Sequence, residues 1–259
     1  METRLGQVVL FGSGETSSHA QPVYARVMQE LGQPVRVSIL ETPAGFQLNS
    51  ANVAEEIGEY LRVHLQNYHP EIHIIPARKK GGFFSPDNPE ILEPMYTSNM
   101  IFFGPGSPTY AVRQLAGSLA WEIVRARHRL GATVVAASAA TIAMSAYALP
   151  VYEIYKVGEE VHWKPGLDFC ADYGLSAVFV PHWNNNEGGE GHDTSRCFMG
   201  KPRFAQLLDL LPQETIVVGV DELTALYLDP QRNLCTVMGL GGVTLLEVST
   251  RRESRFESG

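Results

Sequence analysis

The chain has 259 residues, of which 44% are hydrophobic and 19% charged, and its formal net charge at pH 7 is −8. This composition is typical of a soluble globular enzyme, and the length suffices for one large α/β domain. No apolar run is long enough for a membrane helix, no basic stripe favours nucleic acid, and the three cysteines form no C-x-x-C pair of the kind found in zinc sites. We therefore expect a cytoplasmic protein with no membrane or nucleic-acid partner, no cofactor and no metal.

The first half of the chain alternates strand and helix patterns. Short apolar runs predict strands, and apolar residues at helical spacing predict helices between them. In chain order, the sequence predicts strands at residues 7–11, 35–40, 71–75, 100–103 and 134–137, and helices at residues 21–31, 50–68, 89–98, 109–119 and 121–130. This order predicts an α/β protein with a mostly parallel, doubly wound sheet between two helical layers, which is a three-layer αβα fold.

The later part of the chain changes character. A further short strand is predicted at residues 178–180, and four more follow in close succession, at residues 216–220, 225–228, 235–238 and 243–248. Their spacing predicts antiparallel strands toward the C-terminus that complete the sheet as a meander. Because no linker, repeat or low-complexity block interrupts the chain, we expect residues 1–259 to form a single domain, with a frayed tail after about residue 250.

The segment around Ser138 carries the strongest chemical signal. A β-branched apolar run leads into Ser138, and an Ala-rich helical pattern follows. This layout is typical of a nucleophile elbow, which presents a serine hydroxyl at the carboxyl edge of a sheet beside helix N-terminal amides. The usual signature is G-x-S-x-G, and Ala136 and Ala140 stand here at the glycine positions. Small residues around a serine also occur in plain core packing, and that interpretation stays open.

A serine nucleophile needs a base in hydrogen-bond reach and an acid that orients the base. Among the eight histidines, His182 is the favoured base because it comes directly after a buried apolar strand, where α/β sites gather. Glu153 is the candidate acid, because it stands alone among large apolar neighbours. Such a glutamate lies either on the solvent face of a strand or buried against a partner, and both interpretations stay open. Glu159, Glu160 and Asp221 are the next candidates.

Oxyanion stabilisation requires backbone N–H groups that side chains do not obstruct. The Gly-rich turn from Gly104 to Ser107 directly follows a predicted strand and opens a helix, so we expect this turn to supply one donor and the N–H of Ala139 the other. Ser107 in that turn and Gly14 in the first Gly-rich turn are candidates for substrate binding. A simple strand–helix turn would have the same sequence pattern.

A long polar loop follows His182 and extends to Arg196. It could form an active-site lid in which Arg196 binds a substrate carboxylate through two parallel hydrogen bonds. The alternative is a mobile surface loop. A metal site is a third interpretation, but it matches no established ligand spacing; its ligands would be His182, Glu187, His192 and Asp193.

Together, these features resemble the dipeptidase E/cyanophycinase family of serine peptidases, which have a class I glutamine amidotransferase-like fold. The resemblance runs from Gly12-Ser13-Gly14-Glu15 to Gly219-Val220-Asp221-Glu222-Leu223-Thr224-Ala225, about four-fifths of the chain. It implies the chain order nucleophile, acid, base. The implied roles are nucleophile for Ser138, third triad member for Glu153, general base for His182, and oxyanion donors for Gly106 and Ala139.

The chain also departs from the family pattern. The family elbow is normally Gly-x-Ser-Ala-Gly-Ala, whereas this chain has alanine in place of both glycines and Thr141 at the last position. Cyanophycinases carry Asp-Gln-His before the base, whereas this chain has Val180-Pro181-His182, so cyanophycin is disfavoured as a substrate.

The resemblance implies a serine hydrolase that cleaves a small peptide or amide through a covalent acyl-enzyme, with an acidic residue in the substrate and a homodimer as further options. A different class of function is a small-molecule or peptide binding protein that kept the fold and lost turnover, for which the altered elbow is the signal. A nucleotide binder that uses the Gly12-Ser13-Gly14-Glu15 turn is disfavoured, because the chain lacks the Gly-Lys-[Ser/Thr] of a P-loop.

Overall fold

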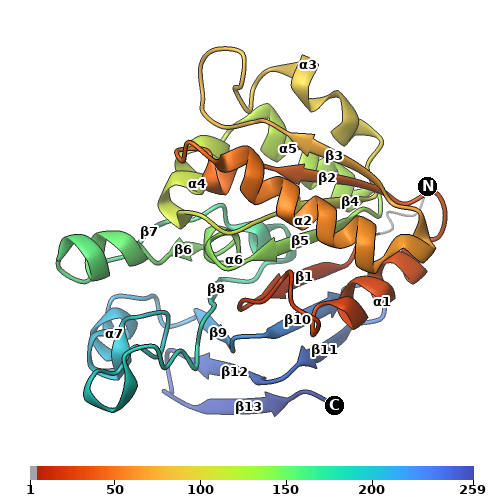
Figure 1. Cartoon of the computed structure of the whole chain (residues 1–259). Coiled ribbons are helices and arrows are strands. Elements are labelled where there is room, and N and C mark those ends of the chain that lie inside the picture. The colour runs from red at the N-terminus through yellow and green to blue at the C-terminus, as the bar shows by residue number, and fades with distance from the viewer. Residues whose placement is uncertain (1–4) are drawn as a thin grey trace.

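A seven-stranded sheet forms the centre of the protein in a computed structural model that describes residues 5–259 (Figure 1). The sheet order is β11 (Leu234–Gly239), β10 (Thr224–Asp229), β1 (Val8–Phe11), β5 (Thr133–Ala137), β4 (Met100–Phe103), β2 (Arg36–Leu40) and β3 (Glu71–Ile75). The five strands β1, β5, β4, β2 and β3 are mutually parallel, and β10 and β11 are antiparallel to their neighbours. The mostly parallel αβα fold that the sequence predicts is therefore confirmed.

Helices cover both faces of this sheet (Figure 1). Helices α1 (Gln21–Leu31) and α2 (Ser50–His64) pack on one face, and α4 (Pro108–Leu115) and α5 (Leu119–Arg129) pack on the other. In α2, Ile57 and Leu61 are buried at helical spacing, as the amphipathic pattern requires. None of the helices within residues 5–259 combines the length and apolar content that a bilayer-spanning segment needs.

The shorter helices connect the sheet to its loops. The helix predicted over residues 89–98 divides into α3 (Pro89–Leu92) and the 3₁₀ turn η3 (Glu93–Tyr96), because Pro94 lacks the N–H that would continue an α-helix. The remaining helical segments are η1 (Thr42–Ala44), η2 (Gln66–Tyr68), α6 (Ala139–Ala143), the π-helical turn η4 (Glu153–Val157), η5 (Phe169–Tyr173), η6 (Gly189–Gly191) and α7 (Gly200–Asp209).

A separate four-stranded sheet contains much of the C-terminal part of the chain. Its order is β13 (Glu253–Glu257), β12 (Gly242–Glu247), β9 (Ile216–Val220) and β8 (Ala177–Val180), and β6 (Tyr147–Ala148) pairs separately with β7 (Lys164–Pro165). The predicted meander is therefore divided: β9 pairs with β8 and β12, and only β10 and β11 extend the central sheet. The three residues between β9 and β10 cross from one sheet to the other.

The tail is ordered, contrary to the expectation of fraying. Strand β13 pairs with β12 along Glu253–Glu257. Arg255 on this strand places a guanidinium nitrogen 2.7 Å from the carboxylate of Asp221, a side chain that is 1% exposed. The tail is fixed because a buried carboxylate needs a charged partner, and Arg255 supplies it.

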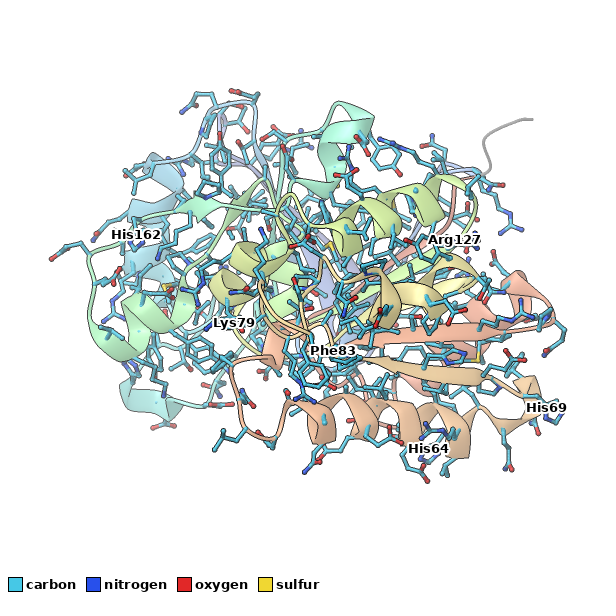
Figure 2. The ribbon with its side chains drawn as sticks, turned by 90° about the horizontal axis from the view of Figure 1, so that it is seen from above. His64, His69, Lys79, Phe83, Arg127 and His162 are labelled. Carbon is cyan, nitrogen blue, oxygen red and sulfur yellow. The ribbon has the colours of Figure 1, made fainter. Side chains whose placement is uncertain are left out.

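Three of the other histidines lie at the periphery. Figure 2 shows His64 on α2, His69 just beyond it, and His162 at the end of the molecule that carries β7. His64 and His69 are exposed, and His162 is partly exposed.

His128, in contrast, is part of the core. It lies in the last turn of α5, is 2% exposed, and packs against Phe169 with 5.0 Å between the ring centroids. Its Nε2 shares a hydrogen bond with the hydroxyl of Tyr173, and its Nδ1 lies 3.3 Å from the carbonyl oxygen of Ala132. Burial lowers the pKa of His128 to about 4. The imidazole is therefore neutral in the folded protein at physiological pH.

This buried histidine makes stability depend on pH. Between the ordinary histidine pKa of about 6.5 and the native value, the unfolded chain binds a proton that the native protein does not, so the free energy of unfolding falls as the pH is lowered. We expect a loss of up to about 3 kcal/mol across this window, measured by urea denaturation. His128→Gln should flatten the dependence, whereas His64→Gln on the exposed face of α2 should leave it unchanged. Equal slopes in the wild type and His128→Gln would contradict this assignment.

Candidate active site

Ser138 lies at a strained turn between β5 and α6. Its φ of 52° is in the left-handed region, which non-glycine residues rarely adopt. Its backbone N–H donates to the carbonyl of Phe11 on β1, 3.2 Å away. Ala136 and Ala140 are 0% and 2% exposed, so the positions that the elbow signature gives to glycine hold buried methyl groups. The turn therefore accommodates alanine at both positions.

His182 stands opposite Ser138, at the carboxyl end of β8. Its Nε2 lies 2.9 Å from Oγ of Ser138, within hydrogen-bond distance. The imidazole is half-buried, and the backbone also has a positive φ, of 50°. The structure thus brings together the two residues that the sequence favours as nucleophile and base.

Glu222 is the carboxylate that contacts His182. Its Oε1 lies 2.8 Å from His182 Nδ1 and also accepts a hydrogen bond of 2.9 Å from the side chain of Asn185. The backbone N–H of Glu222 donates to Asn184 Oδ1 at 2.8 Å. The hydrogen bonds from His182 and Asn185 hold the pKa of Glu222 below its ordinary value, although burial opposes this shift. Glu222 is therefore ionised at neutral pH and fixes the ring orientation of His182.

Glu153 does not bond to His182, contrary to the sequence-based expectation. The segment folds as the π-helical turn η4 and not as a strand, and Oε1 of Glu153 lies 3.5 Å from Nζ of Lys164 on β7. Its Oε2 is buried and has no hydrogen-bond partner among residues 5–259. The chain order of the hydrogen-bonded residues is therefore serine, histidine, glutamate.

The next candidate acids do not replace Glu153 either. Glu159 and Glu160 are exposed, and Asp221 accepts hydrogen bonds from Gly242 and Arg255. Sequence reasoning missed Glu222 although a signal was present: it directly follows a buried strand, just as His182 does. The rule that selected the base would have selected this acid as well.

Both predicted oxyanion donors line the same pocket as Ser138. Gly106 follows β4 by three residues, and Ala139 is the first residue of α6. Within residues 5–259, neither backbone N–H has a hydrogen-bond acceptor. Unpaired backbone donors beside a serine hydroxyl are the groups that can stabilise an oxyanion.

A close backbone approach fixes the position of Gly106. A Cβ at this residue would lie 2.0 Å from the carbonyl oxygen of Pro43, and the N–H of Ser107 donates to the same oxygen at 2.9 Å. Pro43 belongs to η1, which begins directly after Glu41, a side chain that is 3% exposed and contacts Nε of Arg78 at 2.7 Å. An ion pair between this buried carboxylate and the partly exposed Arg78 therefore anchors the turn against which Gly106 packs.

Two of the residues expected to bind substrate have structural roles instead. The hydroxyl of Ser107 accepts from the N–H of Tyr110 at 3.2 Å and so caps the N-terminus of α4. Gly14 has a φ of 76°, and a Cβ there would lie 2.5 Å from a methyl carbon of Leu223. Neither residue lines the pocket beside Ser138.

Arg196 is also directed away from this pocket. Its guanidinium carbon lies 3.7 Å from the centroid of the Trp183 ring, and Nη2 is 3.9 Å from the carboxylate of Glu253 on β13. The side chain is 17% exposed and does not line the pocket. Arg196 thus fastens the loop to β13, because stacking on an indole and pairing with a carboxylate satisfy a guanidinium in place.

The loop residues considered as alternative metal ligands do not form a cluster. Residues 5–259 contain no group of three or more histidine, cysteine, aspartate or glutamate side chains arranged to hold a metal ion. Asp193 instead accepts hydrogen bonds from the N–H groups of Ser195 and Lys201, which lower its pKa to about 2. His192 stacks against Tyr155 with 6.3 Å between centroids.

The pocket in front of Ser138 has a volume of about 310 Å³. Its lining comes from the β4–α4 turn, α6, the segment around η4, and the loop after β8. The lining residues are Gly106, Pro108, Ser138, Ala139, Ile142, Val151, Tyr152, Tyr155, Lys156, His182, Glu187, Cys197 and Phe198. The pocket is large enough for a small organic substrate.

Comparison with known proteins shows a likeness at the level of fold. No family model and no curated protein matches the sequence. A peptidase from an acI-B1 Actinobacterium has a similar crystal structure, with a TM-score of 0.76 and 19% identity over 100% of this chain and 97% of that one. A Listeria monocytogenes EGD-e protein with the provisional name peptidase E has a TM-score of 0.58 and 12% identity over 91% of this chain and 99% of its own. At these identities, the comparison establishes the fold.

The close contact at Gly106 gives a direct test of the turn. Gly106→Ala should destabilise the protein because the added methyl requires the Pro43 carbonyl to move. Gly117→Ala is the matched control: Gly117 also has a positive φ, of 68°, but a Cβ there has no atom of residues 5–259 within 4 Å. We expect the control to lose about 1 kcal/mol and Gly106→Ala at least about 2 kcal/mol more, measured by urea denaturation. Equal losses would show that the turn is not fixed by Pro43.

Proposed function

We propose that the protein is a serine peptidase that cleaves small peptides or amides through Ser138, His182 and Glu222. The observation that carries this proposal is the continuous hydrogen-bond chain from the Ser138 hydroxyl through the imidazole to the carboxylate, with distances of 2.9 and 2.8 Å. A nucleophile, a base and an orienting acid in this order are the groups that acyl transfer requires. The fold shared with two proteins named as peptidases supports the same reaction class.

In the proposed first step, His182 accepts the hydroxyl proton at Nε2 while Oγ of Ser138 attacks the carbonyl carbon of the substrate. The carbonyl oxygen becomes an oxyanion, which the N–H groups of Gly106 and Ala139 stabilise. His182 then donates the proton to the leaving amine, and an ester between Ser138 and the acyl group remains. A water molecule, deprotonated by His182, hydrolyses this ester and restores the hydroxyl.

Glu222 acts through His182 in this mechanism. Its carboxylate holds the proton of the imidazole on Nδ1, so that Nε2 is free to accept the serine proton, and it stabilises the imidazolium that forms. Asn185 contributes by hydrogen bonding to the same carboxylate oxygen. Because the pKa of Glu222 is lowered, the carboxylate keeps its charge across the neutral range.

The altered elbow is compatible with this reaction. The sequence raised a binding protein without turnover as the alternative, because two alanines replace the glycines beside Ser138. Both methyl groups are buried, and Ser138 Oγ is nevertheless 2.9 Å from His182 Nε2. The geometry that a general base needs therefore persists with alanine at both positions.

A matched pair of glutamate variants tests the proposed assignment of roles. Glu222→Gln should lower kcat for small peptides by about 10³- to 10⁴-fold, because the amide no longer selects the required histidine tautomer. Glu153→Gln should stay within about threefold of the wild type, since Glu153 does not contact His182. The measurement is the release of amino groups from a panel of dipeptides and amino-acid amides.

The Ser138→Ala and His182→Ala variants complete this test. Both variants should have a turnover no higher than that of Glu222→Gln. Their midpoints of urea unfolding should stay close to that of the wild type. Activity that survives in Ser138→Ala, or a larger loss in Glu153→Gln than in Glu222→Gln, would contradict the proposed function.

A further inference from the structure

We infer that the pocket beside Ser138 selects an uncharged apolar or aromatic side chain of the substrate and discriminates against a carboxylate. This inference rests on the proposed function and concerns the residue that flanks the scissile bond. It departs from the acidic substrate that the sequence suggested, for which Arg196 was the candidate binding residue.

The inner walls of the pocket are apolar. Ile142, Val151 and Cys197 line it and are 2%, 7% and 2% exposed. The rings of Tyr155 and Phe198 complete the wall, with 5.3 Å between their centroids. Burial raises the pKa of the Cys197 thiol, so this residue is a neutral, weakly polar part of the wall. Apolar side chains gain free energy on such surfaces, whereas a carboxylate loses its hydration.

The charges around the pocket do not favour an anion. Lys156 supplies the only ammonium among its lining residues, and Glu187 places a carboxylate in the same lining. Nζ of Lys156 lies 4.9 Å from the centroid of the Tyr155 ring, on an exposed side chain. The carboxylate of Glu222 is bonded to Nδ1 of His182 and does not line the pocket. An acidic substrate side chain would therefore meet a carboxylate as well as the one ammonium of the lining.

Arg196 cannot compensate for this balance in its observed position. The guanidinium is stacked on Trp183 at 3.7 Å and faces Glu253, outside the pocket. To bind a substrate carboxylate it would have to leave both partners. The bidentate contact that makes arginine a selective carboxylate ligand is thus absent from the pocket lining.

Two series of dipeptides test the inference, X-Ala and Ala-X, with leucine, phenylalanine, aspartate or lysine at X. We expect kcat/KM for leucine and phenylalanine to exceed that for aspartate by about 10- to 100-fold in the series whose variable side chain occupies the pocket. Aspartate should be preferred in neither series. Calorimetric titration of Ser138→Ala with the same peptides should give the same order of affinity, which makes the selectivity measurable without turnover.

Three variants test which side chains determine this selectivity. Arg196→Ala should leave the ratio between leucine and aspartate within about twofold of the wild type, because Arg196 does not reach the pocket. Tyr155→Arg, at a half-buried wall position, should raise the relative kcat/KM for aspartate at least about tenfold. A wild-type preference for aspartate that either Arg196→Ala or Lys156→Met removes would overturn the inference.

The outcomes separate this inference from the proposed function. If Ser138-dependent cleavage occurs and aspartate is preferred, the function stands and the inference fails. If Ser138→Ala and the wild type bind the leucine peptide more tightly than the aspartate peptide but neither cleaves it, the inference stands and the proposed function fails. An absence of both binding and cleavage would overturn both.

Discussion

The chain of hydrogen bonds from Ser138 through His182 to Glu222 joins two different sheets, and the rest of the structure is arranged so that it can form. Ser138 follows β5 of the central sheet, whereas His182 and Glu222 follow the neighbouring strands β8 and β9 of the four-stranded sheet. Parallel strands end at the same edge, which is why these two residues lie together. The two sheets must then hold their edges within hydrogen-bond distance of each other, and the three-residue crossing from β9 to β10 connects them directly.

Close packing behind the site limits how far these edges can shift. The indole of Trp183 lies so near to β9 that a Cβ at Gly219 would be 2.2 Å from it. The same indole carries the guanidinium of Arg196 on its ring, and Phe204 of α7 packs against it at 5.2 Å between centroids. Glycine at position 219 is thus required for the segment after β8 to lie flat on β9. This contact keeps His182 beside Glu222.

Backbone strain is concentrated at the same place. Ser138, His182 and Leu223 all have positive φ values, of 52°, 50° and 54°. Residues in this region of conformational space cost about 1–3 kcal/mol each and persist only where surrounding contacts overdetermine them. Here the three turns directly follow the buried strands β5, β8 and β9. The pairing of these strands fixes the backbone that leads into each turn. The strain lifts the hydroxyl and the imidazole out of their strand ends and toward each other.

The sequence was sufficient to predict the layers of the fold and two of the three residues in the hydrogen-bond chain. Apolar periodicity is a local property, so it located the alternating strands and helices, and the position of Ser138 and His182 after buried strands identified both. It could not show that β9 leaves β10 to pair with β8, because pairing depends on contacts distant in sequence. The choice of Glu153 failed since an acid among apolar residues indicates burial but not which partner it meets. The assignment of Arg196 to substrate binding failed because its stacking on Trp183 depends on the fold of the loop, which the sequence does not show.

Covalent labelling tests the central claim, the activation of Ser138, most directly. The protein would be treated with a fluorophosphonate, and its intact mass and peptide map compared with those of Ser138→Ala. The account predicts a single adduct on the peptide that contains Ser138 in the wild type, slower formation of that adduct in Glu222→Gln, and none in Ser138→Ala. A wild-type protein that stays unmodified, or that carries the adduct on another residue, would contradict it.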